Sequence, residues 1–474
     1  MSAFSSPPAS PPASPAPLLI GSWRERVSRL VYTGLWTVAT PAIAAYLLWR
    51  SRRQPAYRSG WCERFLGRYR GQRTGPCVWI HAVSVGETRA AAPLVLALRA
   101  RYPELSLLVT HMTPTGRDTA IELFGNQVSH AYLAYDYRFS VAHFLHHWRP
   151  VVGIVMETEI WPNLMVAARA AGVPMLLVNG RLSAKSLRNA MRWRSLMRPA
   201  TRGFARILAQ GDDDATRFAA LTGDANVSSI VRVGNLKFDI DVPVAQRELA
   251  MRFRERIASG GSGPRSILLF ASTREGEEAA IFDAWMRRAS RVDARISGTS
   301  PLLVVVPRHP QRFDEVSALA SARGLIAQRR SDGRPVAADT QVWIGDSMGE
   351  LFAYYLVADV AYVGGSLVPL GGQNLIEAAA VGCPVLIGPH TFNFSDTSDE
   401  AVRAGAAIRV ADFDALVEEA LAIACDGARR RRMAGAGMVF AAAHRGATER
   451  TMEIIASSLR AGIAVEAPSQ ISRS

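Results

Sequence analysis

Short apolar segments alternate with longer amphipathic ones over most of this chain, and this alternation constrains the fold more than any other feature. The first series of apolar segments lies at 77–82, 106–111, 151–156, 174–179, 206–209 and 230–233. The segments between them carry apolar residues at three- and four-residue spacing, which is typical of helices. Strands that alternate with helices form parallel sheets covered on both faces, so we predict a doubly wound α/β domain.

A second series with the same alternation begins after a break near residues 235–243. Its expected strands are 267–271, 302–306, 325–327, 342–345, 360–363, 384–387 and 407–410. A length of 474 residues also suits two domains. We therefore predict two Rossmann-like domains that face a central cleft. The expected boundaries are 1–22 for a disordered tail, 23–55 for a membrane-anchor helix, 56–240 and 241–450 for the two domains, and 451–474 for a C-terminal tail.

The N-terminal region combines a Ser/Pro/Ala-rich tail with a charge-free segment from Leu30 to Trp49, about one bilayer span in helical form. Residues 1–75 hold eleven arginines and two glutamates, most of the net charge of +14. Because these arginines flank an apolar segment, they favour an anionic membrane surface over nucleic acid. A membrane anchor is the favoured interpretation, and an interfacial helix and a buried helix are the alternatives. Arginines on both sides leave the orientation undecided.

One carboxylate stands directly after the first expected strand. Apolar residues 77–80 lead into His81-Ala82-Val83-Ser84-Val85-Gly86-Glu87, which precedes a helical pattern. The carboxyl edge of a parallel sheet is where such folds bind ligands, so Glu87 is placed to act as a general base. The alternative is structural, because Ser84 and Glu87 also match the Ser-x-x-Glu capping box at a helix N-terminus.

Glycine-rich and charged loops follow four strands of the second series. They contain Ser272–Glu277, Pro307–Pro310, Asp346–Glu350 and Gly364–Glu377. Backbone N–H groups and helix N-termini at such loops bind anions, an arginine can meet a phosphate, and a carboxylate can accept from sugar hydroxyls. Together they indicate a nucleotide site. The sequence contains neither a Gly-x-x-x-x-Gly-Lys phosphate loop nor a convincing Gly-x-Gly-x-x-Gly fingerprint.

No set of residues has the spacing of metal ligands. The four cysteines are too scattered for a zinc site or a disulfide framework, which fits a reducing compartment. Asp212-Asp213-Asp214 matches an Asp-x-Asp pattern that binds metal ions in many enzymes. Because it precedes a helical segment, where acids are favoured by the helix dipole, we interpret it as an N-terminal cap and expect no metal requirement.

Many motifs together resemble the 3-deoxy-D-manno-octulosonic acid (Kdo) transferases of lipopolysaccharide synthesis. In order, they are His81–Glu87, Met112–Gly116, Met156–Asn163, Asn179–Ser183, Gly234–Asp239, Pro307–Pro310, Met348–Glu350, Gly364–Leu367, Gly372–Glu377 and Gly388–Phe394. The resemblance runs from about residue 20 to residue 450. Gly180 stands where alanine is usual, and Gln373 where histidine is common.

The resemblance implies the two-domain GT-B glycosyltransferase fold and an inverting transfer of Kdo from CMP-Kdo. The implied acceptor is the 6′-hydroxyl of the lipid A precursor, lipid IVA. It implies Glu87 as the base, with Glu157 and Lys237 as transition-state stabilisers. The implied CMP contacts are Pro307, Arg308, Met348, Gly349, Glu350, Asn374, Leu375, Ile376 and Glu377.

Further expectations concern partners and location. The resemblance implies no cofactor, and we expect inner-membrane lipids rather than nucleic acid as a partner. Because CMP-Kdo is made in the cytosol, the catalytic domains should face the cytoplasm at the inner membrane. Glu159 is too near Glu157 to exclude as the functional residue. The alternative functions are another GT-B transferase or nucleotide-sugar epimerase, and an inactive lipid A precursor binder.

Overall fold

The computed structural model describes residues 22–70, 77–239, 242–260, 265–292 and 300–466, and the chain divides into two compact units. The first unit comprises residues 1–236 and 448–474, and the second comprises 237–447. This division falls inside the break expected over 235–243. Most of the tail expected over 1–22 lies outside the described residues.

The first unit contains a parallel sheet whose strands have the order β3-β2-β1-β4-β5-β6-β7 among the described residues. The strands are β1 (Cys77–His81), β2 (Ser106–His111), β3 (Ser129–Tyr132), β4 (Pro150–Met156), β5 (Met175–Gly180), β6 (Arg206–Ala209) and β7 (Ile230–Arg232). The expected strands are confirmed, and β3 is an addition that the apolar pattern missed. β3 pairs with β2 alone at the edge of the sheet, and its sequence, Ser-His-Ala-Tyr, is not an apolar run.

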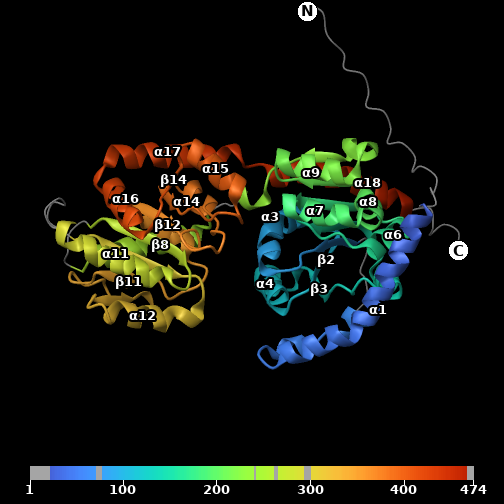
Figure 1. The fold of residues 1–474 in the computed structure, drawn as a ribbon, viewed down its shortest axis with the longest axis horizontal. Helices are drawn as coiled ribbons and strands as arrows, with labels where there is room; N and C mark the ends of the chain where they lie inside the picture. The colour runs from blue at the N-terminus through green and yellow to red at the C-terminus, as the bar shows by residue number, and fades with distance from the viewer. Residues whose placement is uncertain (1–21, 71–76, 240–241, 261–264, 293–299, 467–474) are drawn as a thin grey trace, which may run out of the picture. The chain divides into compact units, whose positions relative to one another are not determined.

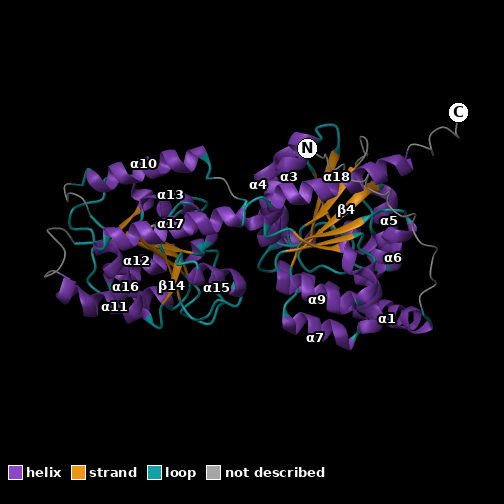
Figure 2. Ribbon diagram, turned by 90° about the horizontal axis from the view of Figure 1, so that it is seen from above, coloured by secondary structure: helices purple, strands orange, loops and turns teal. Residues whose placement is uncertain are grey.

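Helices surround this sheet in Figures 1 and 2. They are α1 (Trp23–Ser51), α2 (Trp61–Leu66), α3 (Val85–Arg101), α4 (Pro114–Phe124), α5 (Arg138–Trp148), α6 (Pro162–Ala170), α7 (Ala184–Arg192), α8 (Arg194–Arg202), α9 (Asp212–Thr222) and α18 (Ala447–Glu466). Short 3-10 turns are η1 (Pro55–Arg58), η2 (Gly125–Gln127), η3 (Asp224–Ser229) and η4 (Leu236–Phe238).

The C-terminal segment differs from the tail expected over 451–474, because it is helical up to Glu466. Met452, Ile455 and Leu459 of α18 are buried, at a spacing that places them on one face of the helix. Arg450 of α18 donates a hydrogen bond to the carbonyl of Val233, at 2.9 Å. The chain therefore returns to the first unit at its end, where Figure 1 shows α18 in dark red beside that unit's helices.

The second unit repeats the architecture, with strands in the order β10-β11-β9-β8-β12-β13-β14, all parallel. The strands are β8 (Ile267–Thr273), β9 (Leu302–Pro307), β10 (Ala327–Arg329), β11 (Val342–Ile344), β12 (Val360–Val363), β13 (Val385–Ile387) and β14 (Ala407–Arg409). The helices are α10 (Val244–Ala258), α11 (Glu277–Val292), α12 (Phe313–Ser321), α13 (Leu351–Val357), α14 (Ile376–Ala380), α15 (Ser395–Arg403), α16 (Phe413–Cys425) and α17 (Gly427–Ala443), with 3-10 turns η5 (Pro310–Arg312) and η6 (Arg330–Asp332).

The sheet of the second unit is buried on both faces, which explains its uninterrupted apolar strands. Along β8, Ile267 and Leu269 belong to one hydrophobic cluster, whereas Leu268 and Phe270 belong to another. Successive side chains of a strand point to opposite faces, so the two clusters lie on opposite sides of the sheet. Figure 2 shows the strands in orange between helices in purple.

Candidate active site

In the first sheet, the order of the strands reverses between β1 and β4. β1 pairs with β2 on one side and with β4 on the other, and His81 lies in register with Thr110 and Val155. The loops that follow β1 and β4 therefore emerge side by side and diverge, which is the point where open α/β sheets bind ligands. Glu87 follows β1, and Glu157 directly follows β4, so the topology brings these two predicted residues to one place.

Glu87 is the third residue of α3, and its own loop orients its carboxylate. The backbone N–H of Val83 donates to Oε2 of Glu87 at 2.8 Å, and the hydroxyl of Ser84 donates to Oε1 at 3.3 Å. The reciprocal capping box considered from the sequence is not formed, because the side chain of Ser84 accepts no hydrogen bond from the helix. The side chain of Ser84 thus helps to position the carboxylate, while its backbone carbonyl accepts the first hydrogen bond of α3, from the N–H of Thr88 at 2.9 Å.

The environment of Glu87 raises its pKa to about 7. Burial is the main cause, and the negative charges of Glu157 and Glu159 add to it, while the hydrogen bond from Val83 opposes the shift. A carboxylate with a pKa near neutral pH accepts a proton more readily than an ordinary glutamate, and a substantial fraction of it is still ionised near neutral pH. Such a carboxylate has the chemistry that a general base requires.

The loop that holds Glu87 is supported by the residues that follow β2. The carbonyl of Val83 accepts hydrogen bonds from the N–H groups of Met112 and Thr113, at 3.2 and 3.3 Å, and from the hydroxyl of Thr113, at 3.2 Å. A Cβ on Gly116 would lie 3.2 Å from the same carbonyl oxygen. The motif Met112–Gly116 therefore packs against the loop between β1 and α3 and fixes its path.

The loop after β4 carries two more carboxylates in a constrained backbone. Glu157 has a φ of +58°, a left-handed conformation that is uncommon for residues other than glycine, and its N–H bonds the carbonyl of Val178 at 2.9 Å. Glu159 accepts a hydrogen bond from the indole N–H of Trp161 at 2.8 Å, and burial raises the pKa of Glu159. Strained backbone at a strand end is typical of functional sites.

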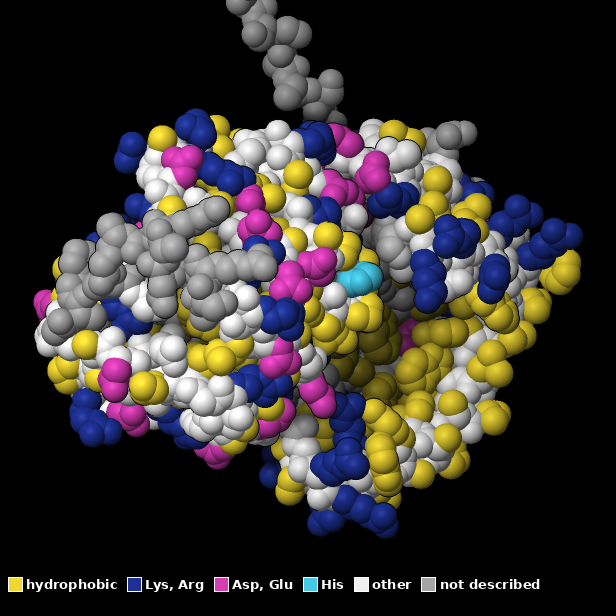
Figure 3. Space-filling view, turned by 60° about the vertical axis from the view of Figure 1, so that its left-hand side comes forward, with side chains coloured by type: hydrophobic (Ala, Val, Ile, Leu, Met, Phe, Trp, Pro, Cys, Tyr) yellow, Lys and Arg dark blue, Asp and Glu magenta, His cyan; other side chains and the backbone are white. Residues whose placement is uncertain are grey.

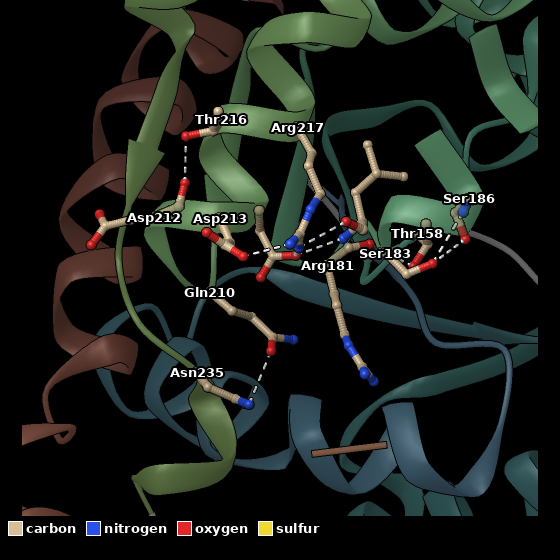
Figure 4. A network of polar contacts seen from close by, with 12 residues as sticks. Thr158, Arg181, Ser183, Ser186, Gln210, Asp212, Asp213, Thr216, Arg217 and Asn235 are labelled. Atoms are coloured by element: carbon tan, nitrogen blue, oxygen red, sulfur yellow. Dashed lines mark hydrogen bonds and ion pairs between the residues drawn. The ribbon is translucent and has the colours of Figure 1, made fainter. Parts of the chain in front are cut away.

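Figure 4 shows the polar network that joins the loops after β4, β5, β6 and β7. Its contacts are Thr158 Oγ1 to the carbonyl of Arg181 at 2.9 Å, the N–H of Leu182 to Asp214 Oδ1 at 2.8 Å, and Asn235 Nδ2 to Gln210 Oε1 at 3.1 Å. Because these loops are tied to one another, the chain that follows Glu157 is held at several points.

The three consecutive aspartates occupy the first turn of α9, as expected, although Gly211 is the N-cap residue itself. Asp214 is buried and bonds Leu182, Asp213 pairs with Arg217, and Asp212 pairs with Arg232 at 3.0 Å. Among the described residues, no group of three or more His, Cys, Asp or Glu side chains is arranged to hold a metal ion.

Lys237 lies in η4, at the first residue of the second unit. The preceding residue is fixed to the first unit, because the N–H of Leu236 donates to Asn179 Oδ1 at 3.1 Å. Asn179 itself has a φ of +56° near the end of β5. The structure thus places Lys237 where the chain passes from one unit to the other, whereas Glu87 and Glu157 belong to the first unit.

The second unit has its own reversal point, between β8 and β12. β8 pairs with β9 on one side and with β12 on the other, so the loops that follow these three strands leave the same edge. Pro307 is the last residue of β9 and Arg308 the first after it, and the N–H of Arg308 bonds the carbonyl of Thr273 at 3.0 Å. Two of the predicted nucleotide contacts therefore lie at the expected edge.

Two buried glutamates at the start of α11 organise these loops, and sequence reasoning missed their roles. Glu277 is fully buried, and its carboxylate accepts from the N–H of Arg274 at 2.9 Å, the hydroxyl of Tyr362 at 2.7 Å and the N–H of Gly365 at 2.8 Å. Glu278, also fully buried, bonds both Arg312, at 2.7 and 2.9 Å, and Thr273. The sequence offered one signal for these roles, which is the pair of adjacent acidic residues between an expected strand and the helical segment that follows it.

Close backbone contacts explain why two positions in these loops are occupied by glycine. A Cβ on Gly364 would lie 2.5 Å from the carbonyl oxygen of Ser272, and one on Gly388 would lie 2.2 Å from that of Ser366. Such distances leave no room for a side chain. The loops after β8, β12 and β13 therefore pack backbone against backbone, which brings their N–H groups together at the edge of the sheet.

The other predicted nucleotide residues lie in the loops after β11 and β12. Met348 is half-exposed and Gly349 has a φ of +76°. The carboxylate of Glu350 has partners within the protein. It accepts two hydrogen bonds from the guanidinium of Arg330, at 2.7 and 2.8 Å, and one from the hydroxyl of Ser347, at 2.5 Å. This ion pair holds the start of α13.

The segment Asn374–Glu377 leads from the loop after β12 into α14. The side chains of Leu375 and Ile376 are buried in the hydrophobic core, so these residues can reach a ligand only through their backbone. Asn374 Oδ1 accepts from the N–H of Ile376 at 3.0 Å, and Glu377 lies in the first turn of α14. In this segment, the side chains that could meet a ligand are therefore those of Asn374 and Glu377.

The family model and the relatives with similar sequences all point to one family. The family model described as 3-deoxy-D-manno-octulosonic-acid transferase (kdotransferase) matches residues 59–240. The 3-deoxy-D-manno-octulosonic acid transferase of Bordetella pertussis is 43% identical over 438 residues, covering 89% of this chain and 98% of the relative. That of Haemophilus influenzae is 34% identical over 430 residues, covering 90% and 98%.

Comparison with solved structures supports the fold. A glycosyltransferase from Rickettsia africae aligns with a TM-score of 0.54, covering 82% of this chain and 99% of the other at 12% identity. At this identity the likeness concerns the fold alone. The predicted fold class, two parallel α/β units of GT-B type, is confirmed.

Proposed function

This chain belongs to the 3-deoxy-D-manno-octulosonic acid (Kdo) transferase family, and we propose that it transfers Kdo from CMP-Kdo to the lipid A precursor lipid IVA. It is a glycosyltransferase of lipopolysaccharide biosynthesis. The donor, the acceptor and the roles of individual residues are the parts that we propose. The anomeric centre inverts in this scheme, without a metal.

The base in this mechanism is Glu87. Its carboxylate removes the proton of the acceptor 6′-hydroxyl while that oxygen attacks the anomeric carbon of Kdo, and the bond to the CMP phosphate breaks with its electrons on the phosphate. A pKa of about 7 suits this proton transfer at cytosolic pH. Glu157, beside it at the same sheet edge, and Lys237, where the chain passes to the second unit, are the proposed transition-state stabilisers.

The donor binds the second unit in this proposal, at the edge where β8, β9 and β12 end. Arg308 meets the phosphate of CMP, which gains negative charge as CMP leaves, and a guanidinium stabilises that charge. The remaining proposed CMP contacts are Pro307, Met348, Gly349, Glu350, the side chains of Asn374 and Glu377, and the backbone of Leu375 and Ile376.

The proposed location is the inner membrane, with the two units on the cytoplasmic side. Among the described residues, α1 is the one helix whose length and composition would allow it to cross a bilayer. A lipid acceptor is available only at a membrane surface, and attachment there raises the rate at which enzyme and acceptor meet.

The observation that carries the proposal is the carboxylate of Glu87 at the reversal point of the first sheet, oriented by Val83 and shifted towards neutral pKa. The test is mass spectrometry of lipid IVA after incubation with CMP-Kdo and EDTA. We expect product heavier by one or more Kdo residues, and the mass difference shows how many Kdo residues the enzyme transfers to each acceptor. Absence of product with Mg²⁺ as well as with EDTA would overturn the proposed donor and acceptor.

Two variants test the base in the same assay. Glu87→Gln keeps the size of the side chain but cannot take the proton, so we expect a loss of turnover of about 10²–10⁴-fold. Glu104→Gln makes the same change at an exposed site of the same unit and serves as the control. Turnover of Glu87→Gln equal to that of the control would remove Glu87 as the base.

A further inference from the structure

Helix α1 has a polarity opposite to that of an ordinary surface helix. Its outward side is apolar, with Val27, Leu30, Val31, Leu35 and Val38 exposed by 45–79%. The side chains that contact the rest of the first unit include the hydroxyl groups of Ser28, Tyr32, Thr33 and Thr40. A helix in contact with water normally buries its apolar side and exposes its polar side. The outward side of α1 is therefore built for an apolar environment.

Hydrogen bonds fasten the polar side of α1 to the first unit. They are Tyr32 Oη to Asp136 Oδ2 at 3.0 Å, Asn163 Nδ2 to Thr33 Oγ1 at 3.0 Å, Thr40 Oγ1 with Tyr137 Oη at 2.7 Å, and Ser28 Oγ with Ser195 Oγ at 2.7 Å. Asp136 is fully buried and also accepts from the N–H groups of Asn163 and Leu164 at the start of α6. The helix is thus part of the hydrogen-bonding network of the unit.

Aromatic packing adds to this attachment. The indole of Trp36 stacks on Tyr135, with ring centroids 5.8 Å apart, and on Trp161, at 6.3 Å. Trp161 is the residue whose N–H bonds Glu159. The middle of α1 therefore packs on the loop after β4, two residues from a carboxylate that raises the pKa of Glu87.

Both ends of α1 are positively charged. Arg24, Arg26 and Arg29 lie in its first two turns and Arg50 in its last turn, and Arg52 and Arg53 follow it, whereas Glu25 is its one acidic residue. Figure 3 shows a face on which hydrophobic side chains gather at the right of the view, with Lys and Arg side chains above and below them. An apolar stripe between two arginine clusters matches a bilayer that contains anionic lipids, each arginine near such a surface contributing about 1 kcal/mol.

A transmembrane orientation conflicts with these contacts. To cross the bilayer as an isolated helix, α1 would have to leave the unit and expose the hydroxyl of Tyr32 to hydrocarbon without its partner Asp136, and unpaired polar groups there are costly. The hydroxyls of Thr33 and Thr40 would lose their partners in the unit but keep the bonds that they donate within α1, to the carbonyls of Arg29 and Trp36. Crossing would also leave the buried carboxylate of Asp136 without one of its donors. In the plane of the membrane surface, the same helix keeps every one of these bonds and buries its apolar side in lipid.

We propose that α1 lies in the plane of the membrane, docked on the first unit, with its apolar side in one leaflet and its arginines on anionic headgroups. The proposal deepens the membrane location given under Proposed function, and it commits to a lipid surface as the occupant of the exposed apolar side. α1 then acts as a monotopic anchor, and both of its ends lie on the same side of the bilayer.

A disulfide that locks α1 to the unit separates the two orientations. Ser28→Cys with Ser195→Cys replaces two hydroxyls in contact, and each single variant is its control. With the full chain and vesicles of phosphatidylcholine and phosphatidylglycerol, we expect the disulfide to form in the vesicle-bound protein and the locked protein to float with vesicles as the reduced protein does. Loss of flotation on locking, or a disulfide that forms only without vesicles, would overturn the proposal.

A matched pair of substitutions tests the apolar side. Val38→Glu introduces a charge at an outward position of α1 that is 79% exposed, and Val439→Glu does so on α17 of the second unit, at a valine that is 71% exposed. We expect Val38→Glu to weaken vesicle binding by about tenfold or more and Val439→Glu to leave it unchanged. Equal binding of the two variants would contradict the proposed lipid contact, while CMP-Kdo turnover on detergent-dispersed acceptor reports the catalytic proposal separately.

The position of the two helix ends completes the test. In a background with the exposed Cys62 and Cys425 changed to serine, Ser22→Cys and Arg52→Cys place one thiol at each end of α1. In inverted inner-membrane vesicles, a membrane-impermeant maleimide should label both positions from outside. Labelling of only one of the two would show that α1 spans the bilayer and would overturn the in-plane orientation.

Discussion

The backbone N–H of Val83 donates a hydrogen bond of 2.8 Å to the carboxylate of Glu87. The loop between β1 and α3 therefore holds the side chain of a residue in the first turn of the helix that it precedes. The same Val83 accepts, through its carbonyl, three hydrogen bonds from Met112 and Thr113. Glu87 is therefore positioned by the loops of two adjacent strands. This arrangement keeps its carboxylate fixed, although burial opposes its negative charge.

The pH profile should report the titration of Glu87. Its pKa is raised to about 7, and a base is active only when it is deprotonated. We therefore expect kcat/KM to rise about tenfold per pH unit below pH 7 and to level off above it. The measurement is the initial rate of Kdo transfer at limiting lipid IVA between pH 5 and pH 9. A profile that is flat from pH 5 to pH 7 would contradict the assignment.

Glu159→Gln should move that profile without abolishing activity. The negative charge of Glu159 contributes to the raised pKa of Glu87, so its removal lowers the pKa of Glu87 and shifts the rising limb to lower pH. The glutamine oxygen can still accept from Trp161, which keeps the loop in place. The same rate measurement over pH checks this shift. Loss of turnover at every pH would instead identify Glu159 as a catalytic residue.

Arg308→Ala should mainly impair use of the donor. Loss of a guanidinium that binds the CMP phosphate is expected to raise the KM for CMP-Kdo about tenfold to a hundredfold. Steady-state kinetics with varied CMP-Kdo measure this effect. Arg287→Ala, which removes an exposed arginine paired with Asp414 in the same unit, should leave the KM unchanged. An unchanged KM in both variants would argue against a phosphate contact at Arg308.

Arg312→Met should destabilise the second unit strongly. Glu278 is fully buried and receives two hydrogen bonds from Arg312, so the substitution leaves a buried carboxylate without its charged partner. We expect a loss of about 3–5 kcal/mol in the free energy of unfolding, measured with a chemical denaturant. Arg323→Met breaks an exposed pair with Asp283 and should cost less than about 1 kcal/mol. Similar losses for both would show that burial does not strengthen the first pair.

Much of the fold follows from local sequence pattern. Apolar runs such as 302–306, which consists of leucine and valine, are uninterrupted, because strands covered by helices on both faces have no polar side to alternate with. β3 escaped this pattern, since Ser129–Tyr132 lies at the sheet edge and pairs on one side only. The helix from Ala447 also differed from the expected tail, because its return to the first unit depends on contacts far apart in sequence, such as Arg450 with Val233.

The sequence by itself determined which residues lie at the carboxyl edges of the strands, because strand ends are encoded locally by the change from apolar runs to loops. Only the tertiary structure decided how those residues interact. It brought Glu87 and Glu157 to one reversal point, withdrew the side chains of Leu375 and Ile376 into the core, and buried Glu277 among donors from two loops. It also turned the polar side of α1 towards the protein, since the partners of Tyr32 and Thr33 lie more than a hundred residues away.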